Sequence, residues 1–376
     1  MPAAYVRAEP APVLPPPVAR AGSAALLRNL FGSPKAVLLS IIALALIVWL
    51  VPELLRYFLF DAVWHGDAAA CRSTDGACWA FIGEKLPYFI YGAYPLDQRW
   101  RVNVVFAIGA VLLVWLLSPP APARRLGLWI AFTVYPVSAF ILLYGWPTLG
   151  FVRVTSDLWG GMLVTLIVAI FGIVVSLPLG ILLALGRRSR LPAVRLTSTA
   201  FIEFMRGVPM IAVLFMADTM LPLFLPEGFE PDRLVRPLVG VALFAAAYMA
   251  EVVRGGLQAL PQGQAEAAEA LGLRYWAKER LVVLPQVLWL TIPAIASTFI
   301  GLFKDTTLVA TVGIFDFLRT VDSARLDPNW SGPTITTTAY SFAALVYFVC
   351  CFGMSRYALG LERRLAARYG RAGGGR

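Results

Sequence analysis

Four polar residues follow directly on an apolar run that ends at Phe303: Lys304, Asp305, Thr306 and Thr307. Charged side chains this close to hydrocarbon are costly unless they are paired or face water, so they are candidates for function. A zwitterion such as an amino acid presents a carboxylate and an ammonium, which Lys304 and Asp305 could complement while the threonines supply hydroxyls. Adjacent residues of a helix face different ways, however. Contact with a substrate and a structural or gating role therefore both stay open.

A second polar pattern, Glu-x-x-Arg-Gly, occurs twice in the chain. The first copy contains Glu203 and Arg206, and the second contains Glu251 and Arg254. Glu and Arg three residues apart can pair on one helical face, which makes both less costly at a membrane boundary. We expect these four residues to be structural clasps at the ends of helices, or part of an inner gate or of a contact with a partner protein.

The stretch EAAEALG, residues 266–272, lies between two long apolar segments and must be a loop at a membrane face, yet it has a helical composition. Ala, Glu and Leu are strong helix formers, and Gly272 is a natural left-handed stop. Glu266 and Glu269 lie on one face near the helix N-terminus, and the small residues beside them admit a partner's backbone. The basic and aromatic residues of 274–280 suit the headgroup layer of a cytoplasmic leaflet.

The sequence lacks the residue patterns of several kinds of catalytic site. A phosphate loop needs a Lys directly after a Gly, and none of the four lysines, at 35, 85, 278 and 304, follows a glycine. Nucleophile elbows, His-Glu metal motifs and zinc-type cysteine spacings are absent, and His65 is the only histidine. We therefore expect no catalytic residue, no metal site and no bound ATP in this chain.

The composition requires an integral membrane protein. Hydrophobic residues make up 59% of the 376 and charged residues only 14%, with a mean hydropathy of +0.73, whereas soluble chains carry about 25% charged residues. The net charge is +10. Membrane topology explains this excess of arginine more simply than nucleic-acid binding does, so no nucleic-acid partner is expected.

The succession of apolar runs predicts an all-α membrane protein of about eight transmembrane helices, since the hydrocarbon core needs about 20 helical residues and the first run exceeds that length. The expected spans are Ala36–Phe60, Val102–Leu117, Leu126–Tyr144, Leu158–Leu185, Leu196–Leu225, Pro237–Val253, Gln286–Phe303 and Ile335–Leu359. Residues 1–35 form a Pro/Ala-rich tail that we expect to be disordered. Residues 36–150 hold three spans without motifs, and 151–376 hold five spans with every motif.

Arginine placement predicts the orientation. The tail, the loops at residues 124–125 and 187–195, the loop at about 255–285 and the C-terminal end fall on one side of the alternation and carry most of the basic charge. By the positive-inside rule that side is the cytoplasm, so both termini are expected there. Cys71 and Cys78 would then lie outside, around an Asp-Gly turn, where a small disulfide is possible.

The spacing around residues 266–285 resembles the signature cytoplasmic loop of the membrane subunits of bacterial ABC importers. That pattern is EAA, three residues, Gly, nine residues, an aliphatic residue, any residue and Leu-Pro, and every spacing holds here. The segments FIEFMRGVP, AAYMAEVVRGGLQALPQGQAEAAEALGL and GLFKDTTLV look like the polar amino-acid (histidine permease-like) branch, especially the larger permease of broad-specificity L-amino-acid systems. The likeness covers roughly residues 155–360. Val282 stands where the pattern often has Ile, a conservative change.

The resemblance implies a five-helix permease core at 151–376, with three additional N-terminal helices, in the bacterial inner membrane. It also implies a homologous permease subunit, a periplasmic amino-acid-binding protein, and two ATP-binding subunits that hold the ATP and Mg²⁺. The Glu-Arg pairs would then form clasps, an inner gate or an ATPase contact. The residues expected to couple to the ATPase are Glu266, Ala267, Ala268, Gly272, Leu284 and Pro285.

An ion-coupled secondary transporter of small polar solutes is the alternative. Such proteins often show two repeats around a midplane ion site, and Glu-x-x-Arg-Gly is the only hint of a repeat here.

Overall fold

The computed structural model describes residues 30–118, 122–226, 228 and 230–373, and these residues are helical throughout, apart from turns and two isolated bridges. Seven helices are long and apolar enough to cross a membrane, and a bent pair adds an eighth. The prediction of an all-α membrane protein of about eight spans is thus confirmed. The predicted disordered tail lies, for residues 1–29, outside the described residues.

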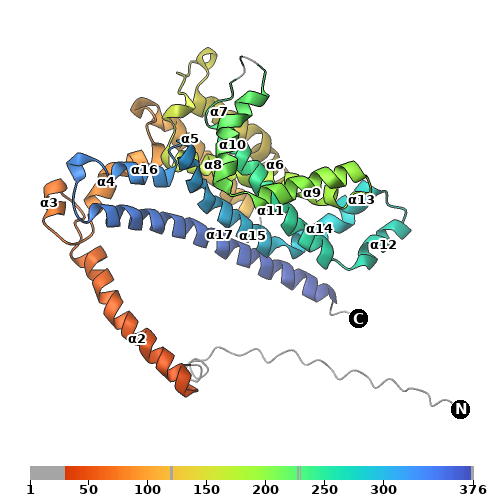
Figure 1. Cartoon of the computed structure of the whole chain (residues 1–376), viewed down its shortest axis with the longest axis horizontal. Coiled ribbons are helices and arrows are strands. Elements are labelled where there is room, and N and C mark those ends of the chain that lie inside the picture. Colours follow the sequence, from red (N-terminus) through yellow and green to blue (C-terminus); the bar gives the residue numbers. More distant parts are fainter. Residues whose placement is uncertain (1–29, 119–121, 227, 229, 374–376) are drawn as a thin grey trace.

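The principal elements follow one another along the chain with short connections. They are α2 (Pro34–Leu55), η1 (Arg56–Phe60), α3 (Ala68–Arg72), α4 (Trp79–Tyr91), α5 (Arg99–Leu117), α6 (Arg124–Trp129), α7 (Tyr135–Tyr144), α8 (Gly161–Arg187), α9 (Pro192–Gly207), α10 (Met210–Met220), α11 (Val235–Ala259), α12 (Gln262–Ala270), α13 (Tyr275–Lys278), α14 (Leu284–Leu290), α15 (Ile292–Asp305), α16 (Phe317–Ala324) and α17 (Ile335–Gly373). In Figure 1, α12 to α14 and the α3–α4 region lie at opposite ends of the bundle.

Helices α8 and α11 form the centre of the bundle because small residues let them approach closely. A Cβ at Gly180 of α8 would lie 2.7 Å from the Cβ of Met249 on α11. Val164, Val168 and Val241 are fully or almost fully buried in the same interface. Small residues are the usual means of close helix packing in membranes, where lipid leaves no hydrophobic force between helices.

The span predicted from Leu196 to Leu225 is not straight. Helices α9 and α10 meet at an angle of 111°, and Val208, between them, is extended with a ψ of 137°. The cause is Pro209, which disfavours the helical conformation of the residue before it and cannot donate a backbone hydrogen bond. The periodic apolar pattern continues through this break, so hydropathy alone did not reveal it.

The N-terminal helices differ in how they join the bundle. Val102 and Val105 of α5 and Leu143 of α7 lie in one hydrophobic cluster with Leu163 of α8, and the Tyr94 hydroxyl donates to the Leu143 carbonyl at 2.8 Å. No residue of α2 is buried, and this helix stands away from the bundle in Figure 1. Two of the three N-terminal spans are therefore packed onto the core, whereas the first, Pro34–Phe60, contacts α17 near its end, where the Tyr57 hydroxyl lies 3.4 Å from that of Thr338.

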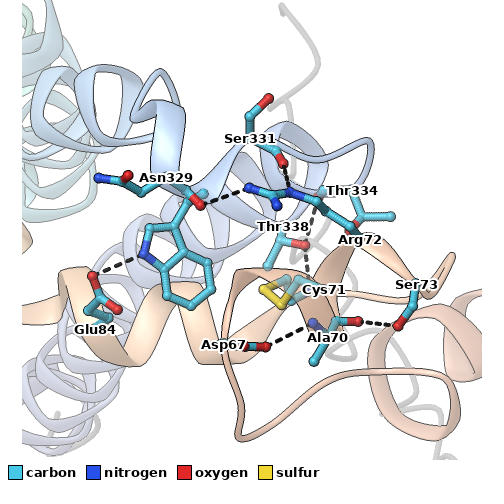
Figure 2. The surroundings of a disulfide bond; sticks show 12 residues. Asp67, Ala70, Cys71, Arg72, Ser73, Glu84, Asn329, Ser331, Thr334 and Thr338 are labelled. Carbon is cyan, nitrogen blue, oxygen red and sulfur yellow. Dashed lines mark hydrogen bonds between the residues drawn. A yellow bond between two sulfur atoms is a disulfide. The ribbon is translucent and has the colours of Figure 1, made fainter.

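A disulfide joins Cys71 and Cys78, whose Cα atoms are 5.5 Å apart (Figure 2). It holds a short loop against the connection between α16 and α17. Arg72 donates to the carbonyls of Ser331 (2.9 Å) and Asn329 (3.1 Å), and the Cys78 amide donates to the Thr338 hydroxyl at 3.0 Å. These hydrogen bonds therefore anchor the cross-linked loop to the start of α17.

Helix α16 begins with a buried acid. The Asp316 carboxylate accepts hydrogen bonds from the amides of Leu318 (3.1 Å) and Arg319 (3.0 Å), as an N-cap does. The Phe317 amide donates to the Thr165 hydroxyl of α8 at 2.9 Å, which ties the helix start to the core. Burial raises the pKa of Asp316 from 3.8 to about 6 although the amide hydrogen bonds oppose the rise.

The free energy of unfolding should therefore fall as the pH rises from about 4 to about 6. Between pH 4 and 6 folded Asp316 keeps a proton that the unfolded chain has released, so the favourable contribution present below pH 4 is lost above pH 6, by about 3 kcal/mol. Asp316→Asn keeps a capping oxygen and cannot titrate. Chemical denaturation in detergent at pH 4 and pH 7 should show a smaller pH difference in the variant; an equal difference in both proteins would contradict this assignment.

Candidate functional site

Helix α12 is a short rigid element with a defined end. Gly272 lies in the left-handed region with φ +76°, where a side chain would be strained. The Gly272 amide donates to the Glu269 carbonyl at 2.9 Å, and the Leu273 amide donates to the Ala268 carbonyl at 3.2 Å. These two bonds form a Schellman motif, which stops the helix and turns the chain back toward the bundle.

The inner side of α12 is attached to the bundle. Ala268 is buried, and Lys278 reaches back from α13 to the Glu269 carboxylate at 2.7 Å. That hydrogen bond and the charge of Lys278 lower the pKa of Glu269. The Gln286 amide donates to the Gln264 side chain at 3.2 Å. The helix and the segment that follows it therefore move as one piece.

The outer side of α12 is free of intramolecular contacts that would bury it. Gly263, Glu266, Ala267 and Ala270 are all exposed. Gly263, Ala267 and Ala270 lie on the side of the helix that faces away from Ala265 and Glu269, whereas Glu266 borders a cavity against the bundle. Small residues on an exposed face allow another backbone to approach closely. The outer face is thus a surface onto which a protein helix or loop can fit.

Leu284 and Pro285 lie where the loop ends and α14 begins. A π-helical turn, Glu279–Val283, precedes α14, consistent with Pro285 lacking the amide needed for a regular ladder. Leu284 packs against the hydrophobic cluster that surrounds Val283. That cluster is made of residues from α8, α9, α11 and α14, namely Ala184, Leu185, Ile202, Ala250, Val253, Leu257, Val283 and Val287. This end of the loop is therefore in direct contact with the central helices.

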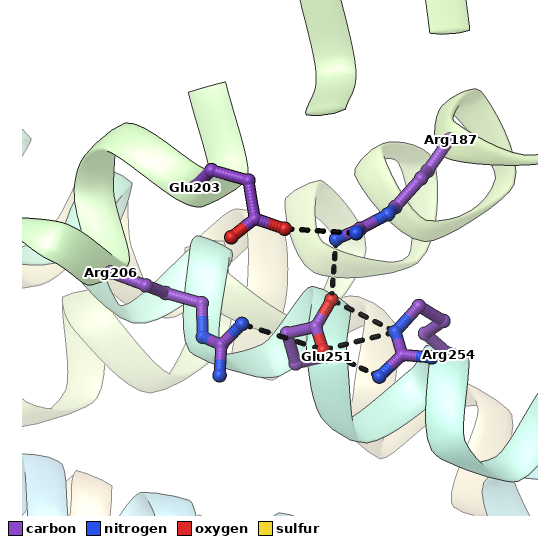
Figure 3. A network of polar contacts seen from close by, with 5 residues as sticks. All are labelled: Arg187, Glu203, Arg206, Glu251 and Arg254. Atoms are coloured by element: carbon purple, nitrogen blue, oxygen red, sulfur yellow. Dashed lines mark hydrogen bonds and ion pairs between the residues drawn. The ribbon is translucent and has the colours of Figure 1, made fainter. Parts of the chain in front are cut away.

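The two Glu-x-x-Arg segments meet in one ionic cluster centred on Glu251 (Figure 3). Arg254 contacts this carboxylate at 2.8 and 3.0 Å, Arg187 at 2.8 Å and Arg206 at 3.5 Å. Glu203 pairs with Arg187 at 2.8 Å. Only the second segment forms the i,i+3 pair that the sequence predicts, because Arg206 reaches across to Glu251 instead.

Arg187, at the end of α8, is the member that the sequence analysis missed. It joins both carboxylates and so connects α8, α9 and α11. Arg187 belongs to a run of arginines at the end of a span, and membrane topology alone explains such a run at the level of the sequence. A cavity of about 720 Å³ is lined both by Arg187 and Arg254 and by Glu266 and Glu269 of α12, so the cluster lies beside the coupling helix.

The residues Lys304 to Thr307 do not converge on one point. They lie within the candidate span Ile292–Val312 rather than beyond its end, because α15 continues as a 3-10 helix from Thr306. Lys304 is exposed, whereas Thr306 is buried and its hydroxyl donates to the Phe303 carbonyl at 2.8 Å. Lys304 is therefore the exposed member and Asp305 and Thr307 are half-buried, and the Thr307 hydroxyl also donates within the helix, to the Lys304 carbonyl at 3.0 Å.

Metal chemistry has no cluster to build on in the described part of the chain. Among those residues, no three His, Cys, Asp or Glu side chains lie close enough to hold a metal ion. The two cysteines outside the disulfide, Cys350 and Cys351, are both partly buried in α17.

Comparisons with known proteins decide the family. Residues 176–367 match the family described as "Binding-protein-dependent transport system inner membrane component". The amino-acid ABC transporter permease YhdY of Escherichia coli K12 is 50% identical over 343 residues, 90% of this chain and 91% of the relative. This chain belongs to that family of importer permeases. It is a transporter subunit without an ATPase domain, and ATP is handled by separate subunits.

A second relative agrees with this membership, and one solved structure is similar to part of the chain. BztC of Rhodobacter capsulatus, named as a glutamate/glutamine/aspartate/asparagine transport system permease, is 40% identical over 430 residues, covering 96% of this chain and 98% of the relative. A crystal structure of an amino acid ABC transporter with histidines is 27% identical, with a TM-score of 0.47 over 54% of this chain and 92% of that one. The importer permease is thus a multi-pass protein of the bacterial inner membrane and works with ATPase subunits and a binding protein. Family membership decides against the ion-coupled alternative.

Removing the charge of Glu251 should destabilise the permease. Glu251→Gln leaves three arginines with only Glu203 to balance them, and we expect a loss of about 2 kcal/mol of unfolding free energy. Glu203→Gln is the matched control: its side chain is 54% exposed and makes one ion pair, so less than about 1 kcal/mol should be lost. Denaturation in detergent measures both. Equal losses would show that Glu251 is not the centre of the cluster.

Proposed function

We propose that this permease couples ATP hydrolysis in two partner subunits to amino-acid uptake through α12. The observation that supports this proposal is that the two sides of α12 differ. Its outer face has small, exposed residues, while its inner face is bonded to the bundle. The coupling residues have different roles; they are Glu266, Ala267, Ala268, Gly272, Leu284 and Pro285. Glu266 and Ala267 contact the ATPase, and Ala268 and Leu284 pack against the bundle. Gly272 ends α12, and Pro285 sets the start of α14.

Coupling is mechanical and follows the contacts. Movement of an ATPase subunit displaces α12, and the Lys278–Glu269 pair and the cluster around Val283 carry the displacement to α8 and α11. The ionic cluster around Glu251 then acts as a clasp, because it keeps the ends of α8, α9 and α11 together. ATP and Mg²⁺ are held by the partner subunits.

The proposed cargo is an L-amino acid delivered by a periplasmic binding protein. Two relatives are named as amino-acid permeases, and a zwitterion needs one group of each charge. Lys304 and Asp305 supply these on a segment within a candidate span. The path itself lies between this chain and a homologous permease subunit, against which residues 151–376 pack as the permease core while residues 36–150 are an addition to it.

Both termini are proposed to be cytoplasmic. The arginine-rich turn after α8 lies on the same side as α12 by their shared contacts, and α17 runs from the α3–α4 end toward the α12 end (Figure 1). The positive-inside rule then assigns this end to the cytoplasm. The disulfide loop lies at the opposite end, in the oxidising periplasm, where such bonds persist.

A long cation on the outer face of α12 should uncouple transport. Ala267→Arg blocks close approach of the ATPase, and we expect uptake into proteoliposomes to fall at least about tenfold, equivalent to 1.4 kcal/mol of contact energy. Ala193→Arg, at an exposed alanine early in α9, is the control and should transport normally. Wild-type uptake by the Ala267 variant would exclude this face as the ATPase contact.

Loss of either charge at Lys304 or Asp305 should weaken the permease's own affinity for cargo. We expect Lys304→Gln and Asp305→Asn to reduce binding of labelled glutamate or glutamine to the assembled complex, without the binding protein, by about tenfold each. Lys35→Gln, which removes an exposed lysine at the start of α2, is the control. Unchanged affinity in both variants would leave these residues with a structural role.

A further inference from the structure

A second cavity, of about 860 Å³, lies between the end of α8, the α8–α9 turn and the segment that follows α12. It is larger than the cavity beside the ionic cluster and shares Arg188, Glu269, Lys278 and Glu279 with it, but the rest of its lining differs. The turn contributes Arg188, Ser189 and Arg190, and the segment after α12 contributes Tyr275, Trp276 and Lys278. The cavity thus brings together two basic stretches that are far apart in the sequence and that coupling to an ATPase does not explain.

Two of its three cations are available to a ligand. Lys278 is already neutralised by Glu269 at 2.7 Å. Arg188 and Arg190 are exposed, and within the described part of the chain neither makes an ion pair with an acidic side chain. Two guanidinium groups side by side at one cavity can bind a phosphate by several charge-assisted hydrogen bonds.

The carboxylates of Glu269 and Glu279 also line the cavity, beside Lys278, and a further part of its wall is apolar and continues along a candidate span. Leu182, Leu191, Val194 and Trp276 line it and are all exposed. Leu182 belongs to a stripe of exposed residues along α8 that also includes Phe171, Val174 and Pro178. Helix α8 is a candidate span that ends at Arg187, so Arg188 and Arg190 lie where hydrocarbon gives way to headgroups.

We propose that this cavity binds an anionic phospholipid of the cytoplasmic leaflet. Its phosphate contacts Arg188 and Arg190, and an acyl chain lies along Leu182 and the exposed stripe of α8. Trp276 lies beside the headgroup, the depth that tryptophan prefers. A soluble anion would use the arginines alone and would gain nothing from the apolar wall. The bound lipid bridges α8 and the segment after α12 and so braces the coupling loop.

The site rests on the proposed function only for the side of the membrane that it faces, and lipid retention can be measured without transport. The assembled permease–ATPase complex is extracted from nanodiscs of phosphatidylcholine with 20% phosphatidylglycerol, and its retained lipids are counted by native mass spectrometry. Wild type should retain phosphatidylglycerol selectively. Arg188→Gln with Arg190→Gln should reduce this retention by about fivefold for each guanidinium, or about 25-fold in all.

Two variants separate the site from general charge and folding effects. Arg125→Gln with Arg195→Gln removes the same charge from two exposed arginines outside the cavity and should retain phosphatidylglycerol as wild type does. Arg188→Lys with Arg190→Lys keeps the charge and should largely restore retention.

Three outcomes would overturn the proposal. They are undiminished retention in the double Gln variant, an equal loss in the control variant, and displacement of phosphatidylglycerol by millimolar inorganic phosphate, which would assign the cavity to a soluble anion. Loss of retention in the double Gln variant alone supports the site whether or not Ala267→Arg uncouples uptake, so the two proposals fail separately.

Discussion

The Glu251 carboxylate holds three arginines together at one end of the bundle, and the arrangement of the central helices there depends on it. A charge near hydrocarbon is tolerated only when it is paired, and each arginine of this cluster has a carboxylate partner. With three guanidiniums against two carboxylates, the cluster keeps a positive excess, and removal of either acid leaves arginines competing for the other. A cluster of this kind fixes the positions of α8, α9 and α11 more firmly than apolar contacts alone, since its hydrogen bonds are directional.

This rigidity gives the coupling loop a base to act on. Helix α12 is too short to be stable in isolation, and it persists because its end is closed by a Schellman motif and its inner side is bonded to Lys278 and buried at Ala268. Beneath it, Glu279 is buried, and burial raises its pKa despite the neighbouring Lys278. The loop is thus preformed, with small exposed residues on one side and contacts to the bundle on the other.

Both ends of the permease contain ion pairs, and one of them also has a covalent bond. At the end that carries α12, Arg187 pairs with Glu203 and Glu251 across three helices. At the opposite end, Lys85 pairs with Asp327 at 2.7 Å, and the disulfide between Cys71 and Cys78 and the hydrogen bonds from Arg72 add to that pair. Helix α2 takes part in neither, as it has no buried residue.

The sequence by itself determined the helical membrane fold, the number of spans to within one, and the coupling loop with its left-handed stop at Gly272. These follow from local composition, because an apolar run of sufficient length has few alternatives in a bilayer. Only the tertiary structure decided which charges pair. Arg187 joins Glu203 and Glu251 across three helices, and Arg206 pairs with Glu251 rather than with Glu203 of its own segment. Pro209 divides a continuous apolar pattern into two helices, with a bend of 111° between them. Ion pairing between helices depends on their packing, and the packing of α8 against α11 is set by contacts between residues far apart in the sequence, such as Gly180 and Met249.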